Sequence, residues 1–197
     1  MSILYEMKRV IELEASSIKA LSEKIGSNYE VAVNLIHNCK GKVVVTGVGK
    51  SGHVGKKIAA SLASTGTPAF FVHSTEGVHG DLGMIQKDDV VILISNSGET
   101  QEVLNLLPSL DKIGSKKIVI TSKSESTLAK ACDIYLAYEY EKEADHLRLA
   151  PTTSSTITLV IGDALAVALS ILKDFKKEEF HLFHPGGSLG THLTNEL

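Results

Sequence analysis

A glycine-rich stretch that follows an apolar run has the residue types to bind an anion. Residues 43–46 are Val-Val-Val-Thr, and they lead into Gly47-Val48-Gly49-Lys50-Ser51-Gly52 ahead of a helical pattern. Backbone N–H groups and a hydroxyl at the start of a helix hold negative charge. The stretch fits G-x-G-x-x-G, but a dinucleotide site wants an acidic residue about 20 positions on, where Val72-His73 stand. A P-loop would need glycine in place of Val44. We therefore predict anion binding by Gly49, Lys50 and Ser51.

A second polar turn follows the third apolar run. It reads Ser95-Asn96-Ser97-Gly98-Glu99-Thr100 and places three hydroxyls around a glycine before another helical pattern. The same residues could simply cap that helix. Three hydroxyls rather than one favour a phosphate site made by Ser95, Ser97 and Thr100. Both turns follow strands, and open α/β sheets bind ligands at the carboxyl ends of their strands.

Two histidines, His73 and His79, flank a turn after the second apolar run, with Glu76 between them. A single loop histidine is usually an ordinary hydrogen-bonding residue. Two of them near the expected active edge of the sheet favour contact with substrate. With no cysteine nearby, they lack the ligands of a structural zinc site.

The elements that must position these residues alternate between strand and helix. Short β-branched runs predict five strands at residues 43–46, 69–72, 90–95, 118–121 and 134–137. Helical spacing predicts helices at residues 3–25, 28–40, 53–65, 99–112, 124–131 and 152–173, before an irregular tail. This alternation indicates an α/β protein, a three-layer αβα sandwich with a five-stranded parallel sheet. We expect one domain over 1–197: N-terminal helices (1–40), α/β core (41–174) and tail (175–197).

Composition narrows the function classes. The chain has 197 residues, a formal net charge of −3 and two cysteines, without the spacing of a disulfide framework or a cysteine zinc site. Mixed charges leave no cationic surface for nucleic acid. We expect no membrane span, because Asp163 interrupts the longest apolar run, at 157–172, and we see no targeting pattern at the N-terminus. These features predict a cytoplasmic protein with a small anionic ligand.

Several stretches together resemble one enzyme family. The turn at 95–100 matches the SxSGxT phosphate loop of the sugar isomerase (SIS) family. Five stretches are similar, in order and over residues 40–192, to the D-arabinose 5-phosphate isomerase branch. They are GVGKSGHVGKKIAASLASTGTPAFFVH, HGDLGM, ISNSGET, LAPTTSSTITLVIGDALAVAL and HPGGSLG. That resemblance implies a SIS, flavodoxin-like fold. Typical members continue into a tandem pair of CBS domains, so with the sequence ending at Leu197 we expect regulation by such domains to be absent.

The resemblance also assigns roles that spacing alone does not. It implies that the important residues for catalysis are Lys50, Glu102, Glu143 and His184. It adds Gly66 and Thr67 as sugar contacts beside His73 and His79, and it implies that His73 can hold an inhibitory zinc. Thr152 to Thr156 form a hydroxyl-rich start to the last long helix, which can also reach substrate.

Each of the four catalytic candidates has a plainer interpretation. Lys50 could be a solvated loop lysine, and Glu102 could complement a helix dipole. Glu143 lies in a charge run that is typical of a solvated surface, and only the resemblance selects it. His184 precedes Pro185-Gly186, a turn that can bring the imidazole to a site, including one in a neighbouring subunit. We assign the base to Glu143 or Glu102 and ring opening to His184.

The sequence and the resemblance together predict an aldose–ketose isomerase that interconverts D-ribulose 5-phosphate and D-arabinose 5-phosphate through an enediolate. It requires no cofactor, supplies Kdo for lipopolysaccharide or capsule, and is implied to be a homotetramer. One alternative is a sugar-phosphate-sensing domain without catalysis. Another is an isomerase of a hexulose or sedoheptulose phosphate.

Overall fold

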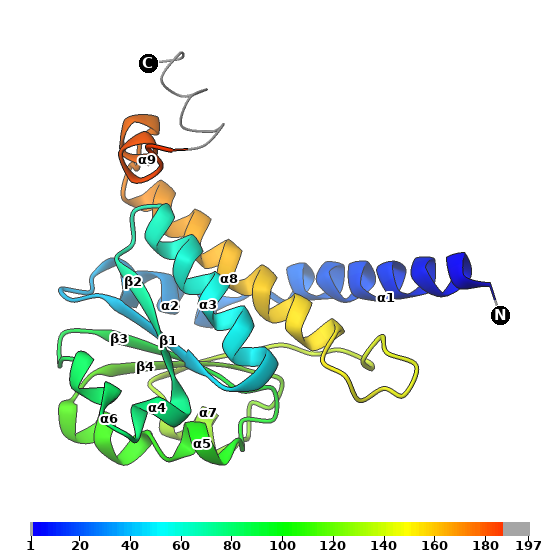
Figure 1. Cartoon of the computed structure of the whole chain (residues 1–197), viewed down its shortest axis with the longest axis horizontal. Helices are drawn as coiled ribbons and strands as arrows, with labels where there is room; N and C mark the ends of the chain where they lie inside the picture. Colours follow the sequence, from blue (N-terminus) through cyan, green and yellow to red (C-terminus); the bar gives the residue numbers. More distant parts are fainter. Residues whose placement is uncertain (1, 187–197) are drawn as a thin grey trace.

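The computed structural model describes residues 2–186, and within them the sequence folds into three layers (Figure 1). The strands are β1 (Val43–Gly47), β2 (Ala69–His73), β3 (Val90–Ile94), β4 (Lys116–Thr121) and β5 (Ile134–Ala137). The helices are α1 (Ile3–Lys24), α2 (Ser27–His37), α3 (Gly49–Ser64), α4 (Ser74–Gly77), η1 (Asp81–Met84), α5 (Gln101–Leu104), α6 (Leu107–Ile113), α7 (Thr127–Ala131), α8 (Thr153–Leu172) and α9 (Lys177–Phe183). All five predicted strands are confirmed.

The sheet is wholly parallel, in the order β2-β1-β3-β4-β5. Strands buried on both faces are apolar along their length, which is why β-branched runs marked them well. Alternate side chains point to opposite faces: Val43 and Val45 join the core under α2, α3 and α8, while Val44 joins the core under α5, α6 and α7. The chain leaves β1 toward β2 and later returns on the other side as β3. This reversal lies between β1 and β3, where open sheets of this kind bind ligands.

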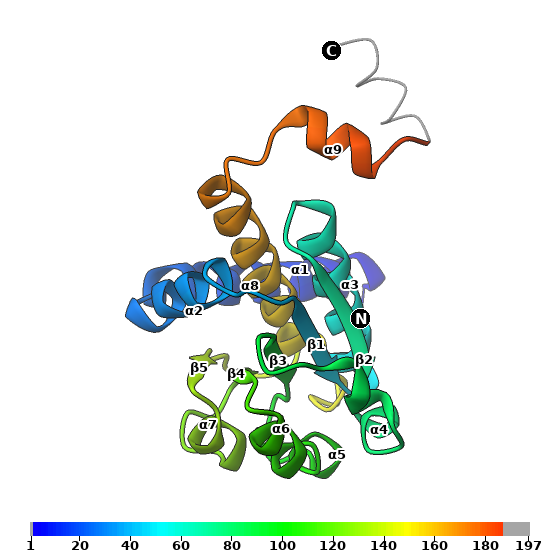
Figure 2. The same cartoon turned by 90° about the vertical axis from the view of Figure 1, so that its left-hand side faces the viewer.

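Helices cover both faces of the sheet (Figure 2). On one side α8 packs against α1, α2 and α3; on the other lie α4 to α7. The N-terminal part of α1 extends beyond this body in Figure 1, with apolar residues such as Ile3 and Met7 exposed.

By length and composition, α8 could cross a membrane, because its most apolar 18-residue window has a mean hydropathy of 2.0. Asp163 therefore does not bring this stretch below the length and hydropathy of a membrane-spanning helix, and that step of the sequence prediction is wrong. In the fold, 39% of the window is buried, and Asp163 forms an ion pair with Lys57 of α3. One side of α8 thus belongs to the protein core.

Two parts of the helix prediction are also wrong. The helix expected over 99–112 is divided at Asn105 and Leu106 into α5 and α6, because Pro108 has no N–H to donate and fits only in the first turn of a new helix. The tail expected to be irregular contains α9. Of the tail, residues 187–197 lie outside the described part of the chain.

Candidate active site

The glycine turn after β1 lets α3 approach the sheet closely. Gly49 has a φ of +56°, and α3 begins there. A Cβ on Gly52 would lie 3.0 Å from the Gly47 carbonyl oxygen, and one on Gly55 would lie 3.0 Å from the Phe71 ring. The glycines therefore serve the packing of α3 on β1 and β2. Lys50 is exposed in the first turn of α3 at the carboxyl edge of the sheet.

The three hydroxyls of the turn after β3 have different surroundings. Ser95 is buried; its Oγ accepts a hydrogen bond from the Gly98 N–H (3.0 Å) and is 2.8 Å from Thr100 Oγ1. Ser97 is exposed, and its Oγ accepts from the Glu99 N–H at 3.1 Å. Gly98 has a φ of +68° and packs on Ser126 so closely that a Cβ would lie 2.0 Å from its Oγ. Ser95 and Thr100 thus shape the turn, while Ser97 is open to a ligand.

Glu143 is buried, with 8% of its surface exposed, although it lies in a run of charged residues. Its Oε2 accepts hydrogen bonds from Thr152 N (2.8 Å), Thr152 Oγ1 (3.2 Å) and Ser154 N (3.2 Å) at the start of α8. Burial alone raises the pKa of Glu143, but these hydrogen bonds bring it below its ordinary value. The carboxylate is therefore ionised at neutral pH and held at a helix N-terminus, where negative charge is favoured.

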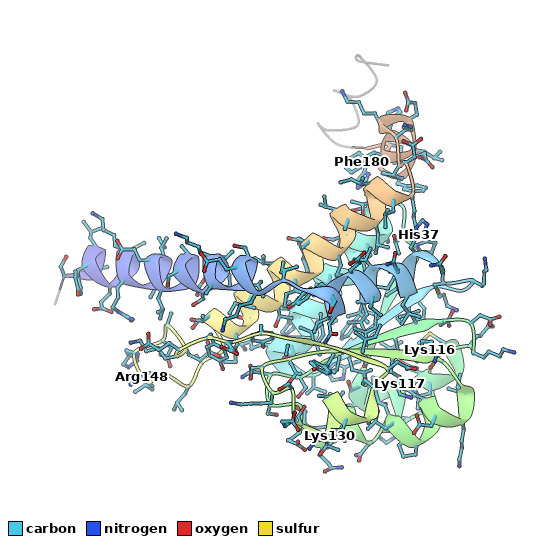
Figure 3. All side chains as sticks on the ribbon, turned by 180° about the vertical axis from the view of Figure 1, so that it is seen from behind. His37, Lys116, Lys117, Lys130, Arg148 and Phe180 are labelled. Atoms are coloured by element: carbon cyan, nitrogen blue, oxygen red, sulfur yellow. The ribbon has the colours of Figure 1, made fainter. Side chains whose placement is uncertain are left out.

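A cavity of about 630 Å³ lies between Glu143 and the turn at residues 95–100, which we name the phosphate turn after its predicted ligand. It is lined by residues that follow three neighbouring strands: Asn96, Ser97, Ser122, Lys123, Tyr138, Glu139, Tyr140, Glu141, Lys142, Glu143 and Arg148. Figure 3 places Arg148 on the loop between β5 and α8. A small adjoining cavity of about 30 Å³ has Ser51, Asn96 and Ser154 in its wall, which brings the glycine turn next to the phosphate turn. Cationic, hydroxyl and carboxylate groups thus converge at the carboxyl edge.

Other predicted residues lie at the same edge outside these two cavities. Glu102 is exposed on α5. His73 ends β2, and its Nδ1 accepts a hydrogen bond from Thr75 N at 3.3 Å, which caps α4. His79 is exposed two residues after α4. Within residues 2–186, no group of three or more His, Cys, Asp or Glu side chains is placed to hold a metal ion. The predicted zinc at His73 therefore stays a prediction.

The structure does not bring Gly66, Thr67 or His184 to this cavity. Gly66 and Thr67 precede β2, at the amino edge of the sheet, and their carbonyl and hydroxyl oxygens accept hydrogen bonds from Lys173 Nζ at 3.3 and 3.0 Å. His184 follows α9, where its ring stacks on Phe180 with centroids 4.0 Å apart. Figure 3 shows Phe180 beyond the opposite end of α8 from the Arg148 loop. Within one copy of the chain, these three residues therefore lie away from the Glu143 cavity.

Sequence reasoning missed several lining residues. Asn96 belongs to the turn predicted to bind phosphate but has no predicted role of its own, and Ser122, Lys123, Tyr138 and Tyr140 lie outside the predicted site residues. The available signal was position: each lies within three residues after a strand predicted to end at the same edge of the sheet.

The chain is similar to proteins of one known family. The SIS domain family model matches residues 35–168. The chain is 51% identical over 193 residues to arabinose 5-phosphate isomerase KdsD of Pseudomonas aeruginosa, covering 98% of this chain and 59% of that protein. It is 48% identical to arabinose 5-phosphate isomerase KpsF of Escherichia coli O6:H1, covering 99% of this chain and 60% of that one. The chain thus spans about three fifths of the length of these curated relatives.

A solved structure is also close. A protein of Escherichia coli CFT073, in complex with arabinose 5-phosphate, has 49% sequence identity and a TM-score of 0.91. The match covers 94% of this chain and all of that one.

Proposed function

Because the chain belongs to the SIS domain family, we propose that it is an aldose–ketose isomerase that interconverts D-ribulose 5-phosphate and D-arabinose 5-phosphate. The observation that carries this proposal is the buried, ionised Glu143 beside a phosphate turn in one cavity. About half-identical relatives named arabinose 5-phosphate isomerase support the choice of substrate. The product would supply Kdo for lipopolysaccharide or capsule, in the cytoplasm.

The substrate phosphate would lie against Ser97 and the turn around Gly98, with Lys123 near enough to the cavity to balance its charge. From the aldose to the ketose, a carboxylate takes the proton from C2, and the electron pair forms an enediolate across C1 and C2. The proton returns to C1, while one proton moves from O2 to O1. No electrons leave the sugar, so the reaction requires no redox cofactor.

We propose Glu143 as the base rather than Glu102, because Glu143 lines the cavity and Glu102 is exposed outside it. Lys50 would stabilise the negative charge of the enediolate from the adjoining glycine turn. His184 would open the sugar ring from a second copy of the chain, with Gly66 and Thr67 of that copy beside it. This arrangement is consistent with the proposed homotetramer and with the position of these residues at the amino edge.

The test is an NMR assay of the purified protein with D-ribulose 5-phosphate in D₂O containing EDTA. The proposal predicts arabinose 5-phosphate with deuterium at C2. Glu143→Gln should lose this activity and Glu102→Gln should retain most of it, with Glu23→Gln on exposed α1 as a matched control. Binding of the sugar phosphate without turnover by the wild type would contradict the proposal and favour a sensor.

A further inference from the structure

One residue of α9, Phe180, contacts the ring of His184 in two ways. The Phe180 carbonyl oxygen lies 2.8 Å from His184 Nδ1, and it also accepts a hydrogen bond from the His184 backbone N–H at 3.1 Å. The imidazole stacks on the Phe180 ring, with centroids 4.0 Å apart and an angle of 15° between the planes. The hydrogen bond fixes one edge of the imidazole, and the stack fixes its plane.

The end of α9 brings these two side chains together. The helix ends at Phe183, and His184 has a φ of −127° and a ψ of 60°, outside the helical region. Pro185 follows, and the residue before a proline is disfavoured in the helical conformation. His184 therefore lies four positions after Phe180, at the point where the chain leaves the helix, and its ring lies against the last turn.

The chemistry of this contact decides which ring nitrogen carries the hydrogen. A carbonyl oxygen only accepts, so His184 Nδ1 must be the donor. In a neutral imidazole the other nitrogen, Nε2, then has the free lone pair. Within residues 2–186, His184 Nε2 makes no hydrogen bond. Nε2 is therefore the ring atom that can exchange a proton with a ligand.

We infer that the Phe180 carbonyl fixes His184 as the tautomer with hydrogen on Nδ1, and that the Phe180 ring is a positioning residue for the imidazole. The inference rests on the proposed function. Because O5 of arabinose 5-phosphate carries the phosphate, its sugar ring closes through O4. Nε2 takes the proton of the C1 hydroxyl, the C1–O4 bond breaks as the C1 carbonyl forms, and the imidazolium gives the proton to O4. Nδ1 keeps its hydrogen throughout.

A purely structural role for His184 predicts something different. Histidine side chains near the end of a helix can hydrogen-bond its last carbonyls and stabilise it without any catalysis. Asparagine separates the two roles, because its amide nitrogen can donate in place of Nδ1 and nothing in it replaces Nε2. We expect His184→Asn to keep wild-type stability and to lose turnover as fully as His184→Ala. Wild-type turnover in His184→Asn would overturn the inference.

The stacking role is tested by kcat and KM of Phe180→Leu, Phe180→Tyr and Phe183→Leu. Phe183 is the matched control on the same helix, because its ring stacks on Phe175, with centroids 5.9 Å apart. With D-arabinose 5-phosphate, we expect kcat of Phe180→Leu to fall about 10-fold with KM within about twofold. Phe180→Tyr, which keeps an aromatic ring, and Phe183→Leu should match the wild type.

The direction of the reaction sharpens this test. D-ribulose 5-phosphate has no sugar ring to open, so the loss in Phe180→Leu should be smaller with the ketose than with the aldose. A structural defect would lower both directions equally. Wild-type kcat in Phe180→Leu, an equal loss in both directions, or an equal loss in Phe183→Leu would overturn the positioning role.

A direct readout of the tautomer separates this inference from the proposed function. Protein labelled with ¹⁵N only at histidine Nδ1 is studied by solid-state NMR at pH 9, above the ordinary titration range of histidine. His184→Asn assigns the signal by difference. We expect His184 Nδ1 to give the signal of a protonated nitrogen. The signal of an unprotonated nitrogen overturns the inference even in an active enzyme, whereas an inactive wild type with the expected signal overturns only the proposed function.

Discussion

Asp89 and Glu143 are both buried carboxylates that accept backbone hydrogen bonds, but they lie at opposite edges of the sheet. Asp89 precedes β3, and both its oxygens are used: Oδ1 accepts from Lys42 N at 2.9 Å, Oδ2 from Gln86 N at 2.8 Å, and Lys42 Nζ lies 3.0 Å from Oδ2. In Glu143, Oε2 accepts the hydrogen bonds from Thr152 and Ser154 at the start of α8, and the residue also lines a cavity. Burial and a low pKa therefore do not identify a catalytic group; access to a ligand does.

The largest expected effect is that of Glu143→Gln. A glutamine oxygen can still accept the hydrogen bonds from Thr152 and Ser154, so the fold is retained, but the amide cannot accept the substrate proton. We expect kcat to fall about 1000-fold, which lies within the range for loss of a general base. The measurement is turnover by NMR, with thermal unfolding as the control. If the variant kept more than a tenth of wild-type activity, Glu143 would not be the base, and Glu102 would be the remaining candidate.

The next effect concerns the copy that supplies His184. Glu143→Gln and His184→Ala are each expected to be inactive alone. If one site combines Glu143 of one copy with His184 of another, unfolding and refolding an equal mixture restores about a quarter of wild-type activity, since one site in four combines both intact residues. The activity of the refolded mixture is compared with that of each variant refolded alone. Failure of the mixture to recover activity would contradict a shared site.

Asp89→Asn makes the same change, from carboxylate to amide, at the amino edge of the sheet that Glu143→Gln makes at the carboxyl edge. The substitution removes the charge paired with Lys42, and the amide nitrogen faces a donor, so we expect the free energy of unfolding to fall by about 1–3 kcal/mol. Activity per folded molecule should not change. Denaturant unfolding and kcat together check this, and a fall in kcat at unchanged stability would show that the two edges are not separate.

The pH dependence of stability provides a smaller test of the same carboxylate. Burial alone raises the pKa of Asp89, but hydrogen bonds from Gln86 and Lys42 and the charge of Lys42 bring it below its ordinary value. A group whose folded pKa is lowered contributes stability that is present above its unfolded pKa, about 3.9, and is lost as pH falls through the folded pKa. Melting temperatures measured from pH 6 to pH 2.5 should therefore fall less steeply for Asp89→Asn than for wild type. Parallel curves would contradict this assignment.

The same comparison shows how far the sequence could predict this molecule. Strands such as β3 were recognisable because a parallel strand is apolar on both faces. The carboxyl-edge rule placed Ser97 and Lys50 correctly at one edge of the sheet. By contrast, the charge run around Glu143 indicated a solvated surface. Only the fold, which brings the run against the start of α8, buries that carboxylate.

Asn96 and Tyr140 could not be paired from sequence. They are 44 positions apart, and their contact exists because β4 places β5 at a fixed distance from β3. In the same way, no local pattern separates Gly66 and Thr67 from the other expected sugar contacts. The order of the strands puts them at the opposite edge.

The proposed site is tested most directly by a crystal structure of Glu143→Gln with D-arabinose 5-phosphate bound. We expect the phosphate at the Ser97 turn, C1 and C2 beside residue 143, and an imidazole from another copy of the chain near the sugar ring. A sugar phosphate bound at the amino edge of the sheet, away from residue 143, would contradict it.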